Sequence, residues 1–434
     1  MKIAGIISEY NPFHNGHAYH LKEVRKKTNA DYIIIVMSGN FMQRGVPAML
    51  NKYQRAKMAL MNGADLVLEL PCLFACSSAE FFAKGAISIF HQLGVIDFLG
   101  FGCENNNLSL LQKVVTLLLE EPEAYRNKLQ NHLRNGCSFP AARSMALKSC
   151  LGNDYFDNLL TSPNNILAIE YLKSLQTLAS PIQPIAIKRE GAAYSDAKLN
   201  NSYSSALAIR SALFNTQNTG QNLDNLKGHV PDSVLSLLQE EYLKTMPVTT
   251  DDFSNLLHYK LLLEKEKGYT EYLDISKDLS DKIKKNLHSY TNFDSFCMLL
   301  KSKELTYTRI CRCMLHILLN IKQNDLAALS SSMESDLASF STTGSNCLPA
   351  PYARILGFRN DSSPLLKELK ANSKIPLLSV AADAKNFMAD EKTLETAKKM
   401  LQLDITASRI YNGAIQNRYN ILLPDEFGAP LLKV

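Results

Sequence analysis

Apolar and polar positions along the chain predict strands that alternate with helices. Continuous apolar runs, typical of strands buried on both faces of a parallel sheet, occur at Ile3–Ile7, Tyr32–Val36, Leu66–Leu70, Val95–Phe101 and Pro184–Lys188. The segments between them have helical spacing of apolar residues. We therefore expect an α/β fold with a Rossmann-like doubly wound parallel sheet. Ligands of such sheets bind beyond the carboxyl ends of the strands.

Helical patterning dominates most of the remaining chain. A helix is predicted from Ser77 or Ser78 to His91, with Glu80 placed as the capping-box partner of Ser77. The amide-rich stretch 215–225 is predicted to be a linker, and the serine-rich stretch 330–345 a loop or a disrupted helix. Shorter elements are expected near 353–358 and 377–380, before a final helix. We therefore expect two parts, residues 1–225 with the sheet and residues 226–434, which are mainly helical.

Composition narrows the class of protein. Hydrophobic residues make up 46% and charged residues 21% of the chain, as in ordinary globular proteins. No apolar run reaches the roughly 18–20 residues that span a bilayer, and no signal peptide is expected because a basic n-region and a cleavage site are missing. The nine cysteines are scattered, which indicates reduced thiols in the cytoplasm. Cys311 and Cys313 are interpreted as buried thiols, and no metal site is predicted.

Positive charge is concentrated in one part of the helical half. Residues 281–322 hold eight basic and three acidic residues, a net charge of +5 that equals the net charge of the whole chain. Aromatic residues are interleaved with them, so this region could bind RNA through phosphate contacts and base stacking. The alternative is a solvated helix face above an aromatic core. The candidate RNA contacts are Lys284, Lys285, Arg309 and Arg312.

The turn after the first strand carries the clearest chemical pattern. His14 and His17 are three residues apart and lead into a helix, with Gly16 between them. The amides and dipole of a helix N-terminus attract phosphate, and donors there can stabilise charge on an α-phosphate. Gly16 is expected to let the adenine or ribose approach the backbone closely. The turn predicts attack on the α-phosphate of a nucleoside triphosphate; the alternative is two capping or surface histidines.

Three further segments could complete such a site. Ser205 and Arg210 begin a second helix and could hold the β- and γ-phosphates, or they could form an ordinary capped helix with a surface arginine. Arg189, beside Lys188, lies at a strand end. Arg44, on the loop after the second strand, lies where the acceptor of the adenylate would enter; a turn-forming role is the alternative.

The histidine turn and the segment that begins at Ser205 resemble known motifs. His14-Asn15-Gly16-His17 resembles the HxGH-type motif of the nucleotidylyltransferase superfamily, which implies a sheet of the nucleotidylyltransferase type. Ser205–Arg210 is similar to the ISSTxIR motif of that superfamily. Ala206 and Leu207 stand where Ser and Thr are usual, so hydroxyl contacts to phosphate at these positions stay open.

Segments spread over most of the chain resemble one family more closely. These segments are similar to the bacterial tRNA(Met) cytidine acetate ligase family and follow the same order: Val36–Phe41 with Gln43–Gly45, Pro163–Leu167, Ile187–Arg189 and Tyr352–Phe358. The resemblance implies that ATP and acetate form acetyl-adenylate. The acetyl group then passes to N4 of the wobble cytidine of elongator tRNA(Met), and AMP and diphosphate leave.

From the residues themselves, His14 and His17 are the catalytic candidates at the phosphates. Arg44 joins them because a cationic side chain is a reasonable partner for acetate, a small anion. The resemblance also implies roles for particular residues. ATP would be the co-substrate, with Mg²⁺ and without a prosthetic group, and the basic helical half would bind tRNA. The ATP-binding residues would be Ile7, Ser8, Glu9, Tyr10, Asn11, Pro12, Phe13, His14, Asn15, Gly16, His17, Ala18, Tyr19, His20, Gly102, Asn164, Asn165 and Arg189, together with the candidates Ser205 and Arg210.

Three other functions remain open from the sequence. A small-molecule adenylyltransferase that makes a dinucleotide cofactor would not need the helical half. A class I aminoacyl-tRNA synthetase is less favoured because we find no KMSKS-like loop. A non-enzymatic RNA-binding protein with a relic nucleotide site would bind RNA without turning over ATP.

Overall fold

The structure, a computed structural model, describes residues 1–104, 107–137, 139–152, 160, 162–189, 199, 203–219, 223–332, 349–386 and 391–434. The described strands form one sheet in the order β5-β4-β1-β2-β3-β6-β7, and β8 pairs with β6. Their bounds are β1 (Ile3–Ser8), β2 (Tyr32–Ser38), β3 (Leu66–Leu70), β4 (Phe98–Cys103), β5 (Gln183–Lys188), β6 (Ala353–Phe358), β7 (Leu377–Leu378) and β8 (Leu432–Lys433).

The expected parallel sheet is confirmed for its five N-terminal strands, β1 to β5. The sheet is mixed, however, because β6 runs antiparallel to β3. The fourth strand begins at Phe98, later than its apolar run predicts. Three strands of the C-terminal half thus extend a sheet that begins in the N-terminal half. The division near residue 225 stays a prediction.

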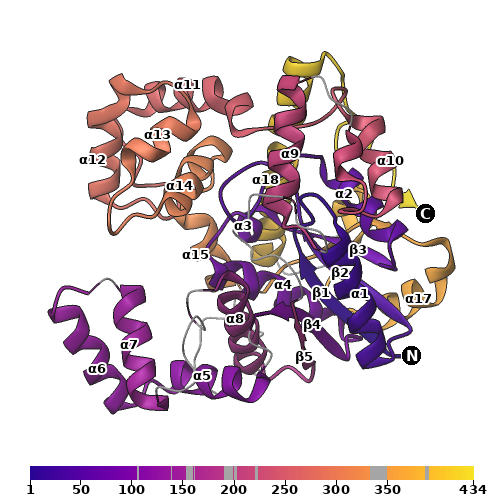
Figure 1. The fold of residues 1–434 in the computed structure, drawn as a ribbon, viewed down its shortest axis with the longest axis horizontal. Helices are drawn as coiled ribbons and strands as arrows, with labels where there is room; N and C mark the ends of the chain where they lie inside the picture. The colour runs from indigo at the N-terminus through magenta and orange to yellow at the C-terminus, as the bar shows by residue number, and fades with distance from the viewer. Residues whose placement is uncertain are drawn as a thin grey trace.

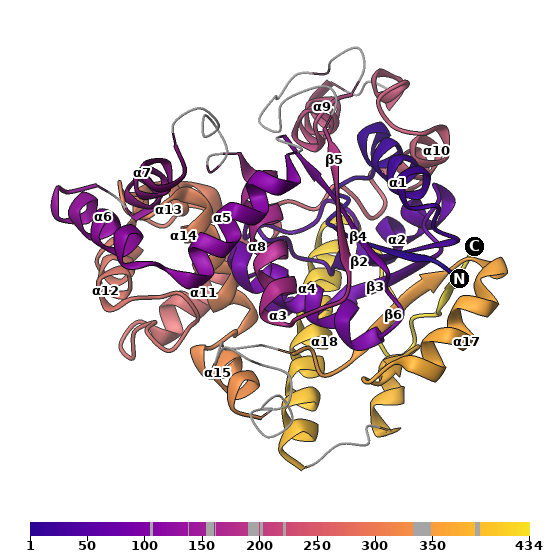
Figure 2. The ribbon, with the colours of Figure 1, turned by 90° about the horizontal axis from the view of Figure 1, so that it is seen from below.

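Each buried strand contributes to two hydrophobic cores, one on each face of the sheet. Side chains alternate between the faces of a strand, so Ile33 and Ile35 belong to one core and Ile34 and Val36 to the other. The first core lies under α1 (Asn15–Thr28), α2 (Lys52–Met61) and α10 (Asp232–Glu241); the second lies under α3 (Cys72–Ala75), α4 (Ala79–Leu93) and α8 (Pro163–Thr177). Figure 2 shows α1 and α10 on one side of the sheet and α4 and α18 on the other.

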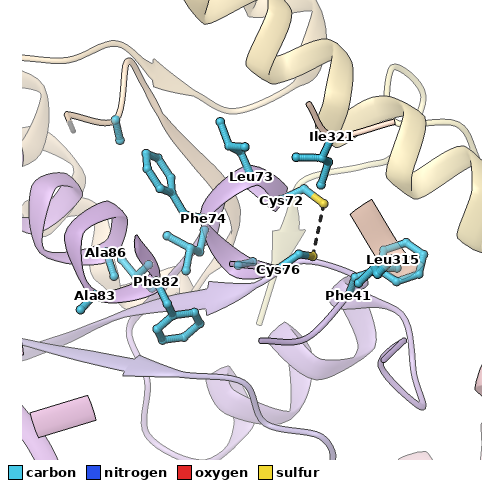
Figure 3. Close-up of a cluster of buried hydrophobic side chains, with 14 of the residues drawn as sticks. Phe41, Cys72, Leu73, Phe74, Cys76, Phe82, Ala83, Ala86, Leu315 and Ile321 are labelled. Carbon is cyan, nitrogen blue, oxygen red and sulfur yellow. Dashed lines mark hydrogen bonds between the residues drawn. The ribbon is translucent and has the colours of Figure 1, made fainter. Parts of the chain in front are cut away.

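The second core also joins the helical half to the sheet. Leu315 and Ile321 pack into the same cluster as α3 and α4 (Figure 3). Cys72 and Cys76 lie in this cluster with their Sγ atoms 3.6 Å apart. The hydrogen bond with Cys76 and burial raise the pKa of the Cys72 thiol. Every described cysteine is free.

Helices make up most of the remaining structure, and Figure 1 shows α11 to α14 grouped apart from the sheet. The helix bounds are α5 (Leu108–Glu120), α6 (Glu123–Arg134), α7 (Phe139–Leu151), α9 (Ala206–Thr219), α11 (Ser254–Glu264), α12 (Lys277–Asn286), α13 (Phe293–Leu300), α14 (Tyr307–Leu319), α15 (Gln323–Ser332), α17 (Ser363–Asn372) and α18 (Glu391–Tyr419). The 3₁₀ turns are η1 (Leu223–Leu226), η2 (Thr250–Phe253), η3 (Leu287–Ser289), η4 (Asn360–Ser362) and η5 (Ala381–Asn386).

One local prediction was wrong, and another stretch is more regular than expected. The Ser77 hydroxyl does not cap α4; it donates to the Leu73 carbonyl oxygen at 2.6 Å, because the short helix α3 precedes α4. The predicted linker 215–225 is partly helical, since α9 continues to Thr219 and η1 begins at Leu223. Most of the serine-rich stretch 330–345 lies outside the described residues.

Among the helices that the structure describes, none has both the length and the apolar character needed to cross a membrane.

Candidate functional site

A cavity of about 390 Å³ opens at the carboxyl ends of the parallel strands. Its walls are the turn between β1 and α1, the loop after β2, the ends of β4 and β5, and the first turns of α8, α9 and α14. Among the described residues, five basic side chains line it, against one carboxylate, that of Glu9: they are Arg44, Lys188, Arg189, Arg210 and Arg312. This excess of positive charge suits an anionic ligand.

The two histidines of the motif build the N-terminus of α1 between them. His14 is the N-cap residue, and its Nδ1 accepts a hydrogen bond from the Gly16 amide at 3.1 Å. Nδ1 of His17 accepts from the His14 amide at 3.2 Å, which completes a reciprocal capping box. The two rings stack with their centroids 3.7 Å apart. The capping interpretation and the phosphate interpretation are therefore compatible, since each ring uses only one nitrogen for the cap.

These contacts fix which nitrogen of each ring can donate. A backbone amide can only donate, so both Nδ1 atoms are acceptors and a neutral ring carries its proton on Nε2. Burial, followed by Arg189 and Arg210, lowers the pKa of His14 to about 3. Burial and the neighbouring His14 lower the pKa of His17 well below its ordinary value. Both rings are thus neutral donors near pH 7, with Nε2–H groups available to phosphate oxygens.

Gly16 has a structural role at the start of α1. A Cβ atom at this position would lie 2.9 Å from Cε1 of His14. The capping ring of His14 therefore requires glycine here. Gly16 also lines the cavity, and close approach of the adenine or the ribose stays a prediction.

His20 lies one helical turn beyond His17 and also lines the cavity. Its Nε2 atom is buried and has no hydrogen-bond partner among the described residues. Burial and Arg189 lower the pKa of His20 to about 4. Because a buried polar atom without a partner is costly, His20 Nε2 is a further candidate to contact a ligand in this cavity.

The ends of β4 and β5 form one side of the cavity. Gly102 lies against Arg189, whose amide donates to the Cys103 carbonyl oxygen at 3.1 Å. Asn164 Nδ2 donates to Glu104 Oε1 at 2.7 Å, and Asn165 Oδ1 accepts from the Glu104 amide at 3.1 Å. The asparagine pair thus holds the end of β4. Asn164 lines the cavity, whereas Asn165 is buried behind its wall.

Helix α9 brings a second helix start to the same cavity. The Ser205 hydroxyl accepts from the Ala208 amide at 3.0 Å, so Ser205 caps α9. Arg210 Nη1 donates to the Asn11 carbonyl oxygen at 2.7 Å and joins α9 to the turn before α1. Arg210 is therefore no surface arginine, and the interpretation as an ordinary capped helix is incomplete.

The loop after β2 forms the other side of the cavity. Glu9 Oε1 accepts from the Gln43 amide at 2.8 Å, which ties this loop to the turn after β1. Arg55, fully buried on α2, was missed by sequence reasoning. It donates to the carbonyl oxygens of Glu9 at 2.7 Å, Ser38 at 3.1 Å and Gly39. An arginine on an amphipathic helix reads as a surface residue, so the sequence offers no signal for this role.

A buried network of ion pairs lies beside the loop after β2. Sequence reasoning missed this network too. Lys52 Nζ lies 2.7 Å from Glu69 Oε1 and 2.9 Å from Glu426 Oε1, and Arg354 pairs with Glu426. These four side chains belong to α2, β3, β6 and the segment after α18. Only the fold brings them together, although Arg354 lies in a segment that carried the family resemblance.

Most of the predicted ATP-binding residues line the cavity, together with Arg44. The exceptions pack behind its wall or beside it: Pro12, Phe13, Asn15, Ala18 and Asn165. Phe13, for example, is fully buried in the core under α1, and Asn15 Nδ2 donates to the Gly228 carbonyl oxygen at 2.7 Å.

The predicted RNA contacts separate into two places. Lys285 on α12 and Arg309 on α14 are exposed, and Lys284 is half-buried. Arg312 instead lines the cavity, with Thr308 from the same helix. In the described part of the chain, no group of three or more His, Cys, Asp and Glu side chains is arranged to hold a metal ion.

Comparisons with known proteins agree with this geometry. The family model described as HIGH Nucleotidyl Transferase matches residues 1–422. The chain is 38% identical over 435 residues to a tRNA(Met) cytidine acetate ligase of Thermoanaerobacter sp. (strain X514), with 100% of both chains covered. It is 39% identical over 420 residues to the protein of that name from Clostridium perfringens (strain ATCC 13124), with 95% of both chains covered.

Solved structures show the same architecture. The structure is similar to apo TmcAL of Thermotoga maritima with a TM-score of 0.86, 29% sequence identity and full coverage of both chains. It is similar to the same Thermotoga maritima protein bound to alpha-thio ATP with a TM-score of 0.85, 28% identity and full coverage of both chains.

Proposed function

The chain belongs to the tRNA(Met) cytidine acetate ligase family of the HIGH nucleotidyl transferases, and we propose on this premise that it is an ATP-dependent tRNA acetate ligase. It activates acetate as acetyl-adenylate and transfers the acetyl group to N4 of the wobble cytidine of elongator tRNA(Met). The observation that carries this proposal is the pair of neutral Nε2–H donors of His14 and His17 in a strongly basic cavity.

The first step forms one bond and breaks another at the α-phosphorus. A carboxylate oxygen of acetate attacks, and the bond from the α-phosphorus to the bridging oxygen breaks, so that diphosphate leaves with the electron pair. Donors aimed at the non-bridging oxygens stabilise the charge that develops there. His14 and His17 supply these donors, while Arg210 and the amides at the start of α9 hold the β- and γ-phosphates.

The second step needs an acceptor amine beside the bound adenylate. N4 of cytidine attacks the acetyl carbon, the bond to the phosphate oxygen breaks, AMP leaves and the amine loses a proton. An anticodon base is single-stranded and can be splayed into a pocket. Arg44, on the acceptor side of the cavity, is proposed to bind acetate through a charge-assisted contact.

We propose that Mg²⁺ enters with ATP and neutralises charge on the phosphates. Mg²⁺ binds through substrate phosphates with one or two carboxylates. Glu9 is the only carboxylate among the described cavity residues, and its Oε1 already accepts from the Gln43 amide and the Ser38 hydroxyl. The residues present therefore fit a metal that is held mainly by the phosphates and water.

In this proposal the two parts of the chain have different roles. Residues 1–225 form the ATP-binding part, and residues 226–434 form the basic part that binds tRNA, apart from the C-terminal strands that complete the sheet. A tRNA substrate places the enzyme in the cytoplasm. Lys284, Lys285 and Arg309 contact the phosphate backbone of the tRNA, which gives salt-dependent affinity.

Incubation with ATP, labelled acetate and bulk tRNA tests the activity. We expect label in tRNA that depends on ATP. Unlabelled tRNA in the presence of proven ATP binding would contradict the proposal. Formation of a dinucleotide would favour the small-molecule adenylyltransferase, and tRNA binding without ATP turnover would favour the relic nucleotide site.

Two sets of variants test the proposed residue roles. H17A should abolish acetyl-adenylate formation and leave tRNA binding intact, whereas H288A, at an exposed histidine, should leave acetyl-adenylate formation unchanged. Retained turnover in H17A would refute the phosphate role.

Charge reversal at Lys284, Lys285 and Arg309 should weaken tRNA binding and flatten its salt dependence. Reversal of the exposed Lys367 and Lys370 on α17, far from α12 in Figure 1, is the matched control. Equal tRNA affinity in the two variants would place the RNA surface elsewhere.

A further inference from the structure

The sheet order divides the cavity into two sides. β1 lies in the middle, with β4 and β5 on one side and β2 and β3 on the other. Two of the proposed ATP contacts beyond the histidine turn, Gly102 and Arg189, come from the β4–β5 side. The β2 side is lined by the loop that carries Arg44 and by one element of the helical half, the start of α14.

Helix α14 reaches the cavity with one face of its first two turns. Thr308 and Arg312 are four residues apart, so their side chains share that face. The loop after β2 packs against the backbone of the same turns. Gly45 has φ +76, and a Cβ atom there would lie 2.3 Å from the backbone nitrogen of Arg312. This close approach puts the chain segments that bear Arg44 and Arg312 side by side.

Arg312 carries a charge that no ion pair among the described residues neutralises. The side chain is half-buried, and its Nε atom is buried without a hydrogen-bond partner among the described residues. No ion pair to Arg312 occurs in the described part of the chain; Asp274 acts on it only through its longer-range charge. Burial lowers the pKa of the Arg312 guanidinium, and Arg309 lowers it further. A desolvated cation without a carboxylate partner is unfavourable until an anion binds.

We propose that Arg312 binds the carboxylate of acetate on the β2 side of the cavity. This assignment rests on the proposed function. A guanidinium can hold both oxygens of a carboxylate through its fork of N–H groups, and the Thr308 hydroxyl offers a further donor beside it. Acetate held there faces the α-phosphate bound at His14 and His17. The helical half then supplies a group to the activation step, before any tRNA has to bind.

The positions of Arg309 and Arg312 on α14 show why acetate, rather than a tRNA phosphate, is the anion proposed for Arg312. Arg309 lies one turn before Arg312 and is exposed, so it is within reach of an RNA backbone that runs over the surface. Arg312 lies on the wall of the cavity. The two arginines therefore occupy different environments on the same helix.

Exchange of labelled diphosphate into ATP measures acetate activation in the absence of tRNA. In R312Q we expect the acetate concentration for half-maximal exchange to rise about tenfold to a hundredfold, as for the loss of a charge-assisted contact. R312K, which keeps the charge without the fork, should show a smaller rise. The affinities for ATP and for tRNA should stay within about twofold of the original values. R126Q, at an exposed arginine on α6, should exchange normally.

Three results would overturn the assignment. Normal acetate dependence in R312Q with weakened tRNA binding would place Arg312 in the RNA surface. An equal loss of ATP and acetate binding with a lower melting temperature would give it a structural role. An unchanged R312Q in all of these assays would leave it without a ligand. By contrast, no acetate-dependent exchange in the unaltered protein would refute the proposed function itself.

Discussion

Replacement of Gly16 by alanine is expected to lower the rate of acetate activation and to leave the free energy of unfolding nearly unchanged. The new Cβ atom would lie 2.9 Å from Cε1 of the His14 ring. Real Cβ atoms do not approach other atoms this closely, so the ring must leave its capping position. His14 then loses its contact with the Gly16 amide, its stacking on His17 and the orientation of its Nε2–H group.

The expected changes in stability nearly cancel. Loss of the cap destabilises the helix by about 1 kcal/mol. Alanine in place of glycine within a helix stabilises it by up to about 1 kcal/mol. The free energy of unfolding of G16A should therefore stay within about 1 kcal/mol of the original. Removal of one preorganised donor to an oxyanion lowers kcat by about 10²- to 10³-fold, so acetate activation should fall by this factor.

Diphosphate exchange and denaturant unfolding of the same protein samples check this prediction. G413A is the matched control, because Gly413 lies within α18 and a Cβ atom there meets no atom within 4 Å. It should gain stability and keep its activity. Undiminished exchange in G16A would show that the position of the His14 ring does not matter to catalysis, and the argument from its Nε2–H donor would then be wrong.

Two further predictions concern the buried network under the site. Lys52→Met leaves Glu69 and Glu426 buried without their ammonium partner, so the free energy of unfolding should drop by about 3–5 kcal/mol, whereas Lys57→Met on the same helix should change it little; equal effects in denaturant unfolding would contradict the network. Burial raises the pKa of Glu426, but Lys52 and Arg354 outweigh it and lower the value to about 2 from 4.5. Because the folded-state pKa is depressed, Glu426 contributes about 3 kcal/mol of stability that is fully present above pH 4.5 and lost as the pH falls towards 2. The stability gap between the original protein and Glu426→Gln should therefore narrow below pH 4.5; a constant gap would refute the depressed pKa.

Local patterns along the chain predict the strands of the parallel sheet because each is an apolar run buried on both faces. The antiparallel β6 could not be placed in this way. The residues of β6 predict a short apolar element. No local sequence feature indicates that this element pairs with β3 rather than forming a separate sheet. The pairing depends on contacts between segments almost 300 residues apart, such as Glu69 with Arg354.

For the candidate site too, local features could be predicted from the sequence, and contacts between distant segments could not. The histidine turn could be predicted because its signal is local: a strand, a short turn and a helix start carry all the residues. The packing of Gly16 against the His14 ring could not be predicted, since the position of that ring depends on the cap geometry. Arg55 was missed entirely, because its partners are carbonyl oxygens, which every residue possesses and no sequence pattern marks.

Contacts between distant segments decide how the two halves of the chain act together. An enzyme that only adenylated a small molecule would have no physical reason to place a helix of the C-terminal half on the wall of its nucleotide cavity. Here the loop after β2 packs so closely on α14 that only glycine fits at position 45. Any shift of α14 must therefore move the acceptor side of the cavity. A tRNA bound to the basic surface of the same helix would thus act directly on the geometry of acetate activation.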